Sequence, residues 1–74
     1  MQIFKNNFIQ KPPNILMDQV NGVWYYGEAW SLSAATSQSV WKITRITFPV
    51  TVEYADGDTN FNNIWDNRLS LSYS

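Results

Sequence analysis

The dipeptide Asn21-Gly22 most constrains the fold, because it separates two stretches that have the pattern of β-strands. A two-residue type I′ turn needs positive φ at both central positions, and Asn followed by Gly adopts them at little cost. Residues 15–20 lead into this turn and residues 23–30 lead out of it. The sequence therefore predicts a β-hairpin over residues 15–30.

The outgoing strand of this hairpin has two unlike faces, since side chains alternate along a strand. The slim face suits close packing and holds Val23, Tyr25, Gly27 and Ala29. The broad face is aromatic with one carboxylate and holds Trp24, Tyr26, Glu28 and Trp30. Flat rings stack on sugars and a carboxylate accepts hydroxyl protons, so Trp24, Tyr26 and Trp30 form a candidate interaction face. An ordinary role in the core or at a subunit interface is the favoured interpretation of these three rings.

Three further stretches carry strand patterns. Side chains of residues 40–48 fall into two alternating sets that end at Pro49. Residues 50–54 show the same strand period and end at the turn residues Asp56-Gly57. The tail 70–74 alternates again, which would put Leu71 and Tyr73 on the same side of a short edge strand. Residues 31–39 are small and polar, which is typical of a loop. We therefore expect a mainly β fold, a small antiparallel sheet or barrel of about four to five strands.

A short C-terminal helix is predicted where the spacing changes. Large apolar residues recur at i, i+3, i+4 and i+8, namely at Phe61, Ile64, Trp65 and Leu69. Three of them, with Arg68, are the expected structural anchors: Phe61, Ile64 and Trp65. Trp65 is expected to press back onto the sheet. Charge pairing is expected between Asp66 or Glu53 and Arg68 or Arg45.

Residues 1–14 read as an extended arm, followed by a single domain over residues 15–74. Pro12 and Pro13 fix an extended backbone between the two parts. The arm holds four large apolar side chains, which are candidate assembly residues: Ile3, Phe4, Phe8 and Ile9. Burial of each such side chain stabilises by about 1.5–3 kcal/mol. The arm is expected to dock on its own domain or on a neighbouring subunit, with disorder as the remaining alternative.

A chain of 74 residues without cysteine has few ways to stabilise itself. It forms no disulfide, and without histidine a zinc site is not expected. Four Trp, four Tyr and four Phe are more rings than one small core is expected to hold. The composition therefore favours a homo-oligomer, with some rings at a subunit interface.

Several classes of function find no support in the sequence. The familiar nucleophile-base pairs are absent, so we expect no enzyme and no cofactor. Asp56, Asp58 and Asn60 match the start of a calcium loop, but Phe61 and Asn67 replace its required Gly and Glu. A turn and helix cap explain the same three residues. The net charge is −1 with scattered basic residues, so nucleic-acid binding is not favoured. Neither a signal peptide nor an apolar run of membrane-spanning length is recognised, so we expect no membrane association.

Part of the chain resembles a group of short proteins encoded by tailed bacteriophages, many from marine samples. The resemblance covers roughly residues 23–74 and rests on YGEA at 26–29, SVWKITRI at 39–46, YADG at 54–57 and, after Phe61, WDNRLSLSY at 65–73. Such proteins lie near virion genes, so the resemblance implies a structural protein of the phage particle, made in the host cytoplasm. It implies no catalytic or binding residues.

Three functional hypotheses follow. The first is a non-enzymatic virion component that assembles in multiple copies with itself and other virion proteins, through its aromatic faces and its arm. The second is a glycan-binding module for attachment to the host, using Trp24, Tyr26 and Trp30. The third is an Sm-like or SH3-like small barrel that binds single-stranded nucleic acid by stacking. The low basic content argues against the third.

Overall fold

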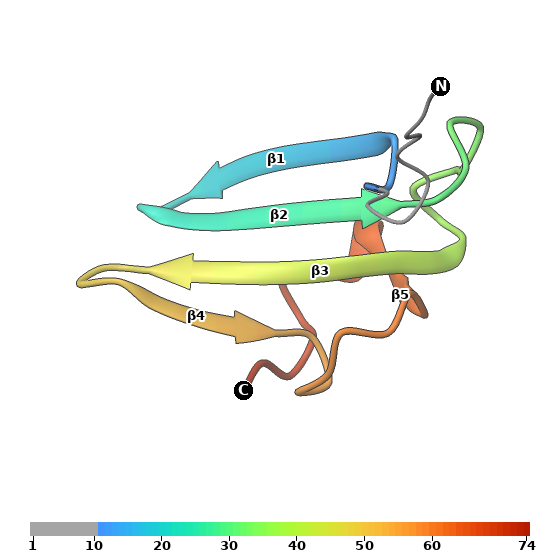
Figure 1. The fold of residues 1–74 in the computed structure, drawn as a ribbon. Helices are drawn as coiled ribbons and strands as arrows, with labels where there is room; N and C mark the ends of the chain where they lie inside the picture. Colours follow the sequence, from blue (N-terminus) through green and yellow to red (C-terminus); the bar gives the residue numbers. More distant parts are fainter. Residues whose placement is uncertain (1–10) are drawn as a thin grey trace, which may run out of the picture.

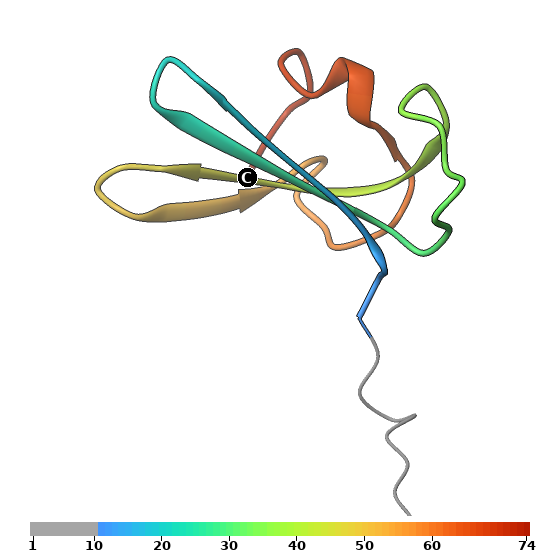
Figure 2. The same ribbon diagram turned by 90° about the horizontal axis from the view of Figure 1, so that it is seen from above.

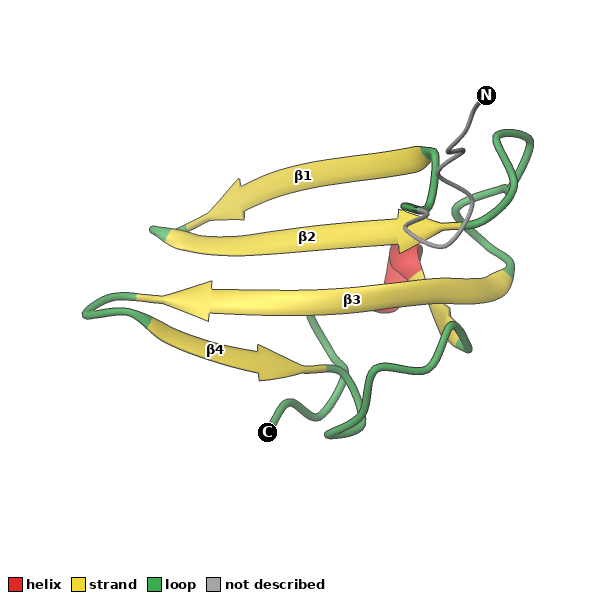
Figure 3. Ribbon diagram, in the orientation of Figure 1, coloured by secondary structure: helices red, strands yellow, loops and turns green. Residues whose placement is uncertain are grey.

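The computed structural model describes residues 11–74, and the predicted assembly residues Ile3, Phe4, Phe8 and Ile9 lie outside this range. The fold is mainly β, as expected (Figure 1, Figure 3). Its elements, in chain order, are β1 (Asn14–Val20), β2 (Val23–Ala29), β3 (Ser39–Thr47), β4 (Thr51–Tyr54), β5 (Asn63–Ile64) and the 3-10 turn η1 (Trp65–Asn67). The antiparallel strands stand in the order β1-β2-β3-β4, and β5 pairs with the first residues of β3. Within residues 11–74 β1 pairs only with β2, so the sheet is open.

The predicted turn at Asn21-Gly22 is present. Asn21 has φ 51° and Gly22 has φ 80°, the positive values that a type I′ turn requires. Val20 and Val23 are the last pair of the ladder before it. The other turn predicted from a glycine also adopts positive φ, at both Asp56 (60°) and Gly57 (73°).

The predicted helix is shorter than the apolar spacing suggested. Only Trp65–Asn67 are helical, as one 3-10 turn, while Asn63 and Ile64 form β5. The Asn63 side chain is buried and donates a hydrogen bond to the carbonyl of Trp41 at 3.2 Å. In a helix, the backbone N–H groups of the first turn would have no partner within the helix. As a strand, Asn63 and Ile64 pair with β3 instead. Leu69 consequently lies 59% exposed rather than on a buried stripe.

The core lies between the sheet and the C-terminal segment. Six buried apolar residues form it: Tyr25, Ala29, Trp41, Ile43, Ala55 and Trp65. The rings of Trp41 and Trp65 lie 6.1 Å apart, and Trp41 Nε1 donates to the carbonyl of Ala35 at 3.0 Å. Gly27 leaves room for Trp65, because a Cβ at Gly27 would lie 2.5 Å from Trp65 Cε3. The slim face of β2, which the alternation marked as suited to close packing, is therefore the face that packs into the core, and the broad aromatic face does not.

Two arginines form ion pairs, that of Arg68 between the C-terminal segment and the sheet and that of Arg45 within the sheet. Nε and Nη2 of Arg68 donate to Oδ2 of Asp18 at 3.0 and 2.7 Å, which joins the C-terminal segment to β1. The Arg68 guanidinium also lies 4.6 Å from the centre of the Trp65 ring. Arg45 pairs with Glu53 at 2.6 Å, one of the predicted combinations, and this hydrogen bond raises the pKa of Arg45. The expected partner of Arg68 on its own segment was wrong: Arg68 pairs across the fold with Asp18 and not with Asp66.

The C-terminal tail returns to the edge of the sheet at β4. Tyr73 forms a β-bridge with Ala55, and Leu71 and Tyr73 both pack against the core, as predicted for one side of an edge strand. The Tyr73 hydroxyl donates to the carbonyl of Arg68 at 2.8 Å, and its ring meets Tyr25 edge-on at 5.9 Å. Burial, reinforced by the neighbouring Tyr25, raises the pKa of Tyr73 from 10.0 to about 12.

This shift predicts an alkaline loss of stability. Between pH 10 and about 12 the unfolded chain loses the Tyr73 proton while the folded chain keeps it, so the unfolded state gains relative stability. The contribution of the Tyr73 hydroxyl to the free energy of unfolding is complete below pH 10 and is lost as the pH rises toward 12. Urea unfolding at both ends of this range should show a smaller alkaline loss for Tyr73→Phe than for the wild type. Tyr26→Phe, on the opposite face of the sheet, is the matched control and should keep the wild-type loss. Equal losses in wild type and Tyr73→Phe would contradict this assignment.

Candidate functional site

One face of the sheet is covered by β5, η1 and the C-terminal tail, and the other is largely open, with Phe61 beside Lys42 at one end. Figure 2 shows β5, η1 and the C-terminal residues on one side of the four long strands. We call the opposite side the outer face. The strand register defines it as three cross-strand rows: Ile15, Glu28 and Lys42; Met17, Tyr26, Thr44 and Tyr54; and Gln19, Trp24, Ile46 and Val52.

The outer face is rich in apolar side chains that remain accessible. Ile15, Met17 and Val52 are 44%, 62% and 49% exposed. Trp24 and Tyr26 lie half-buried between them, in adjacent rows. The charged residues of the rows are Glu28 and Lys42, which pair with each other at 3.4 Å. The surface is thus apolar and aromatic at its centre and has a neutralised ion pair toward one end.

Trp30 packs against a ring from the C-terminal half of the chain, Phe61, and not against Trp24 or Tyr26. It follows the last residue of β2, is 52% exposed, and packs against Phe61 with ring centres 5.4 Å apart and ring planes tilted by 39°. Phe61 is consequently a rim residue rather than an anchor of the core. Among the other predicted anchors, Trp65 and Arg68 hold the C-terminal layer in place, and Ile64 is half-buried in β5.

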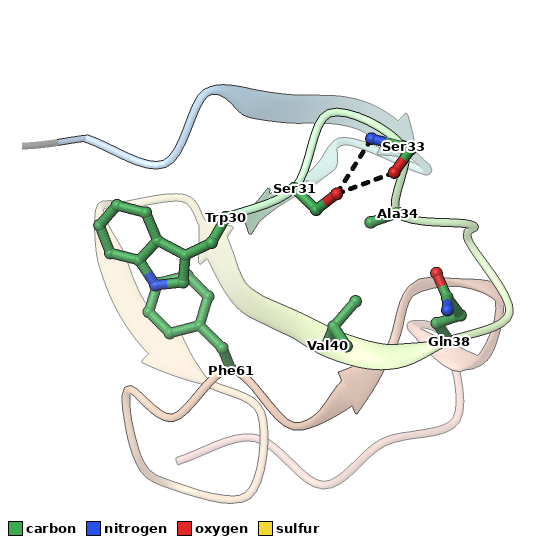
Figure 4. A pocket seen from close by; sticks show the side chains of 7 residues that line it. All are labelled: Trp30, Ser31, Ser33, Ala34, Gln38, Val40 and Phe61. Atoms are coloured by element: carbon green, nitrogen blue, oxygen red, sulfur yellow. Dashed lines mark hydrogen bonds between the residues drawn. The ribbon is translucent and has the colours of Figure 1, made fainter.

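A pocket of about 370 Å³ opens beside this aromatic pair (Figure 4). Its lining combines the two rings with small and polar residues: Trp30, Ser31, Ser33, Ala34, Gln38, Val40 and Phe61. In Figure 4 the Trp30 and Phe61 rings stand on one side, Gln38 stands across from them, and Val40 lies between. Sequence reasoning missed Gln38 and the serines, because a small polar loop gives no sign of which of its side chains converge.

The acidic turn after β4 is held by a local side-chain hydrogen bond. Asp58 Oδ1 accepts a hydrogen bond from the Asn60 amide at 3.0 Å, so its carboxylate is engaged in the turn. No group of three or more acidic, histidine or cysteine side chains within residues 11–74 is arranged to hold a metal ion. In the same part of the chain, no helix has the length and apolar character needed to cross a membrane.

Comparison with known proteins adds no relative: no protein-family model, no curated protein and no solved structure matches this chain.

Proposed function

We propose that the chain is a non-enzymatic structural component of a tailed-phage virion that assembles in multiple copies through its outer face. The observation that carries this proposal is the accessible apolar surface at Ile15, Met17 and Val52, flanking Trp24 and Tyr26. Each such side chain contributes about 1.5–3 kcal/mol when it is removed from water. A 74-residue chain without disulfides gains substantially from covering this surface.

The occupant that we propose for the outer face is residues 1–10 of a neighbouring copy. This segment has four large apolar side chains and one charged side chain, Lys5, so it suits an apolar face that has few charges of its own. Ten extended residues span about 33 Å, and four strands spaced by about 4.8 Å are crossed in less than half that length. The segment is therefore long enough to follow one row across all four strands.

Residues 11–13 leave β1 on the side of the sheet opposite η1, which is the side of the outer face (Figure 2). The backbone bends at Pro13, and Pro12 is buried. We assign the occupant to a neighbouring copy rather than to the chain's own domain because the composition, with twelve aromatic rings and no disulfide in 74 residues, favours a homo-oligomer.

The assignment to a virion rests on the resemblance of residues 23–74 to short tailed-phage proteins. A repeated, self-associating β domain suits such a particle, because a small subunit used many times builds a large shell or tail economically. On this proposal the partners are other copies of the chain and other virion proteins.

Sedimentation equilibrium at micromolar concentration tests the proposal. The wild type should be oligomeric, and Met17→Lys with Val52→Lys should raise the dissociation constant at least about a hundredfold, because two apolar contacts become charged. Phe4→Ser with Phe8→Ser should have a similar effect. Leu69→Lys, at an exposed site outside the outer face, is the control and should assemble normally. A stable, monodisperse wild-type monomer would contradict the proposal.

A further inference from the structure

The pocket between Trp30 and Gln38 has the features of a small-molecule site, and it lies beyond the Glu28–Lys42 row at one end of the outer face. Its volume of about 370 Å³ falls in the range of ligand pockets, which runs from about 300 to 1,000 Å³. Loop residues 31–38 and the rings of Trp30 and Phe61 build its walls. The loop is held at its start and at its middle, since Asn14 Nδ2 donates to the carbonyl of Ser31 and Trp41 Nε1 donates to that of Ala35.

One wall of the pocket is an aromatic platform. Trp30 is 52% exposed although it contacts Phe61, so a flat apolar surface remains open to a ligand. Lys42 Nζ lies 6.0 Å from the centre of the Phe61 ring and pairs with Glu28, so its charge is already compensated. A ligand with a flat, weakly polar face would stack on this platform.

The facing wall supplies neutral hydrogen-bonding groups. Gln38 Oε1 accepts from the Ala35 amide at 2.7 Å, which orients the side-chain amide, and within residues 11–74 its Nε2 has no hydrogen-bond partner. The hydroxyls of Ser31 and Ser33 lie 2.9 Å apart, so one of the two hydroxyl protons remains available to a ligand. None of the seven lining residues is charged.

We propose that this pocket binds a neutral pyranose unit of a glycan, with the sugar ring stacked on Trp30 and its hydroxyls bound by Gln38, Ser31 and Ser33. A pyranose presents an apolar C–H face and a rim of hydroxyls, which matches one aromatic wall and one neutral polar wall. A nucleotide base would also stack, but its phosphates need cations, and the nearby Lys42 is paired with Glu28. The proposed site uses Trp30 with Phe61 rather than with Trp24 and Tyr26, which lie on the outer face.

Titration of the full chain with methyl glycosides of glucose, galactose, mannose and N-acetylglucosamine, followed by NMR, tests the proposal. At least one glycoside should shift the Trp30 indole N–H and the Gln38 side-chain amide in a saturable way. The expected dissociation constant is on the order of 1 mM, typical of a ligand with about a dozen non-hydrogen atoms. Trp30→Ala should weaken binding about tenfold or more. Gln38→Ala removes the whole side-chain amide at an exposed position, so it should also weaken binding while the chain stays folded.

Leu32→Ala is the matched control, because Leu32 belongs to the same loop and is 75% exposed but does not line the pocket. It should bind like the wild type. The proposal is overturned if none of the four glycosides shifts these two resonances, or if the shifts are unchanged in Trp30→Ala. It is also overturned if uridine monophosphate binds in place of the glycosides. These outcomes are independent of assembly, since the double variant Met17→Lys with Val52→Lys should still bind the sugar.

Discussion

Trp65→Ala should leave the chain largely unfolded at physiological temperature. Trp65 is 6% exposed, its ring lies over Gly27 and 6.1 Å from the Trp41 ring, and Arg68 packs on its face. Truncation of a buried Trp costs about 3–5 kcal/mol. A domain of this size has a free energy of unfolding of about 5 kcal/mol. Circular dichroism and urea unfolding measure the loss directly.

Two further variants separate loss of the core from loss of an aromatic ring in general. Trp65→Phe should be partly tolerated, because much of the apolar volume is kept. Trp30→Ala should change the unfolding free energy far less, since Trp30 is 52% exposed at the rim. A Trp65→Ala protein that folds normally and loses only a binding activity would show that Trp65 belongs to a binding surface instead.

Gly27→Ala should cost about 1–3 kcal/mol of stability, although Ala is normally the better residue in a strand. The new Cβ would lie 2.5 Å from Cε3 and 2.6 Å from Cζ3 of Trp65, and 3.3 Å from Cε3 of Trp41. Neither indole has room to withdraw, because both are buried in the same core. The overpacking should therefore lower the midpoint of urea unfolding.

A double-mutant cycle tests the physical reason for this cost. In a Trp65→Phe background the smaller ring leaves space, so Gly27→Ala should cost less than it does in the wild type. Gly22→Ala is the matched control: it has nothing within 4 Å and φ +80°, so its cost of about 1 kcal/mol comes from backbone strain alone. That cost should be the same in both backgrounds. An additive Gly27–Trp65 cycle would contradict the close-packing account.

The parts of the fold that local chemistry determines were predictable from the sequence. Asn21-Gly22 located the hairpin because few residue pairs accept two positive φ angles. The alternation along residues 23–30 separated the Gly27 face from the Trp24 face, and burial in the structure confirms this separation. Residues 40–48 and 50–54 were likewise recognisable as strands.

The parts that depend on contacts distant in sequence were not predictable. The spacing of apolar residues alone cannot distinguish a helix over residues 61–69 from a short strand followed by a 3-10 turn. The strand forms because β5 pairs with β3, which is distant in sequence. The Asp18–Arg68 ion pair joins residues 50 positions apart, which no local pattern reveals. The pocket depends on the close approach of Trp30 and Phe61, which belong to two separate loops.

Photocrosslinking from the centre of the outer face tests the proposed assembly most directly. A benzoylphenylalanine in place of Met17, in a mixture of isotopically light and heavy chains, reports which residues cover the outer face and from which copy they come. Met17 is 62% exposed, so the substitution should leave the core intact. We expect crosslinked peptides of mixed isotope composition that join position 17 of one chain to residues 1–10 of another. Crosslinks confined to peptides of a single chain, or an absence of crosslinks to residues 1–10, would contradict the account.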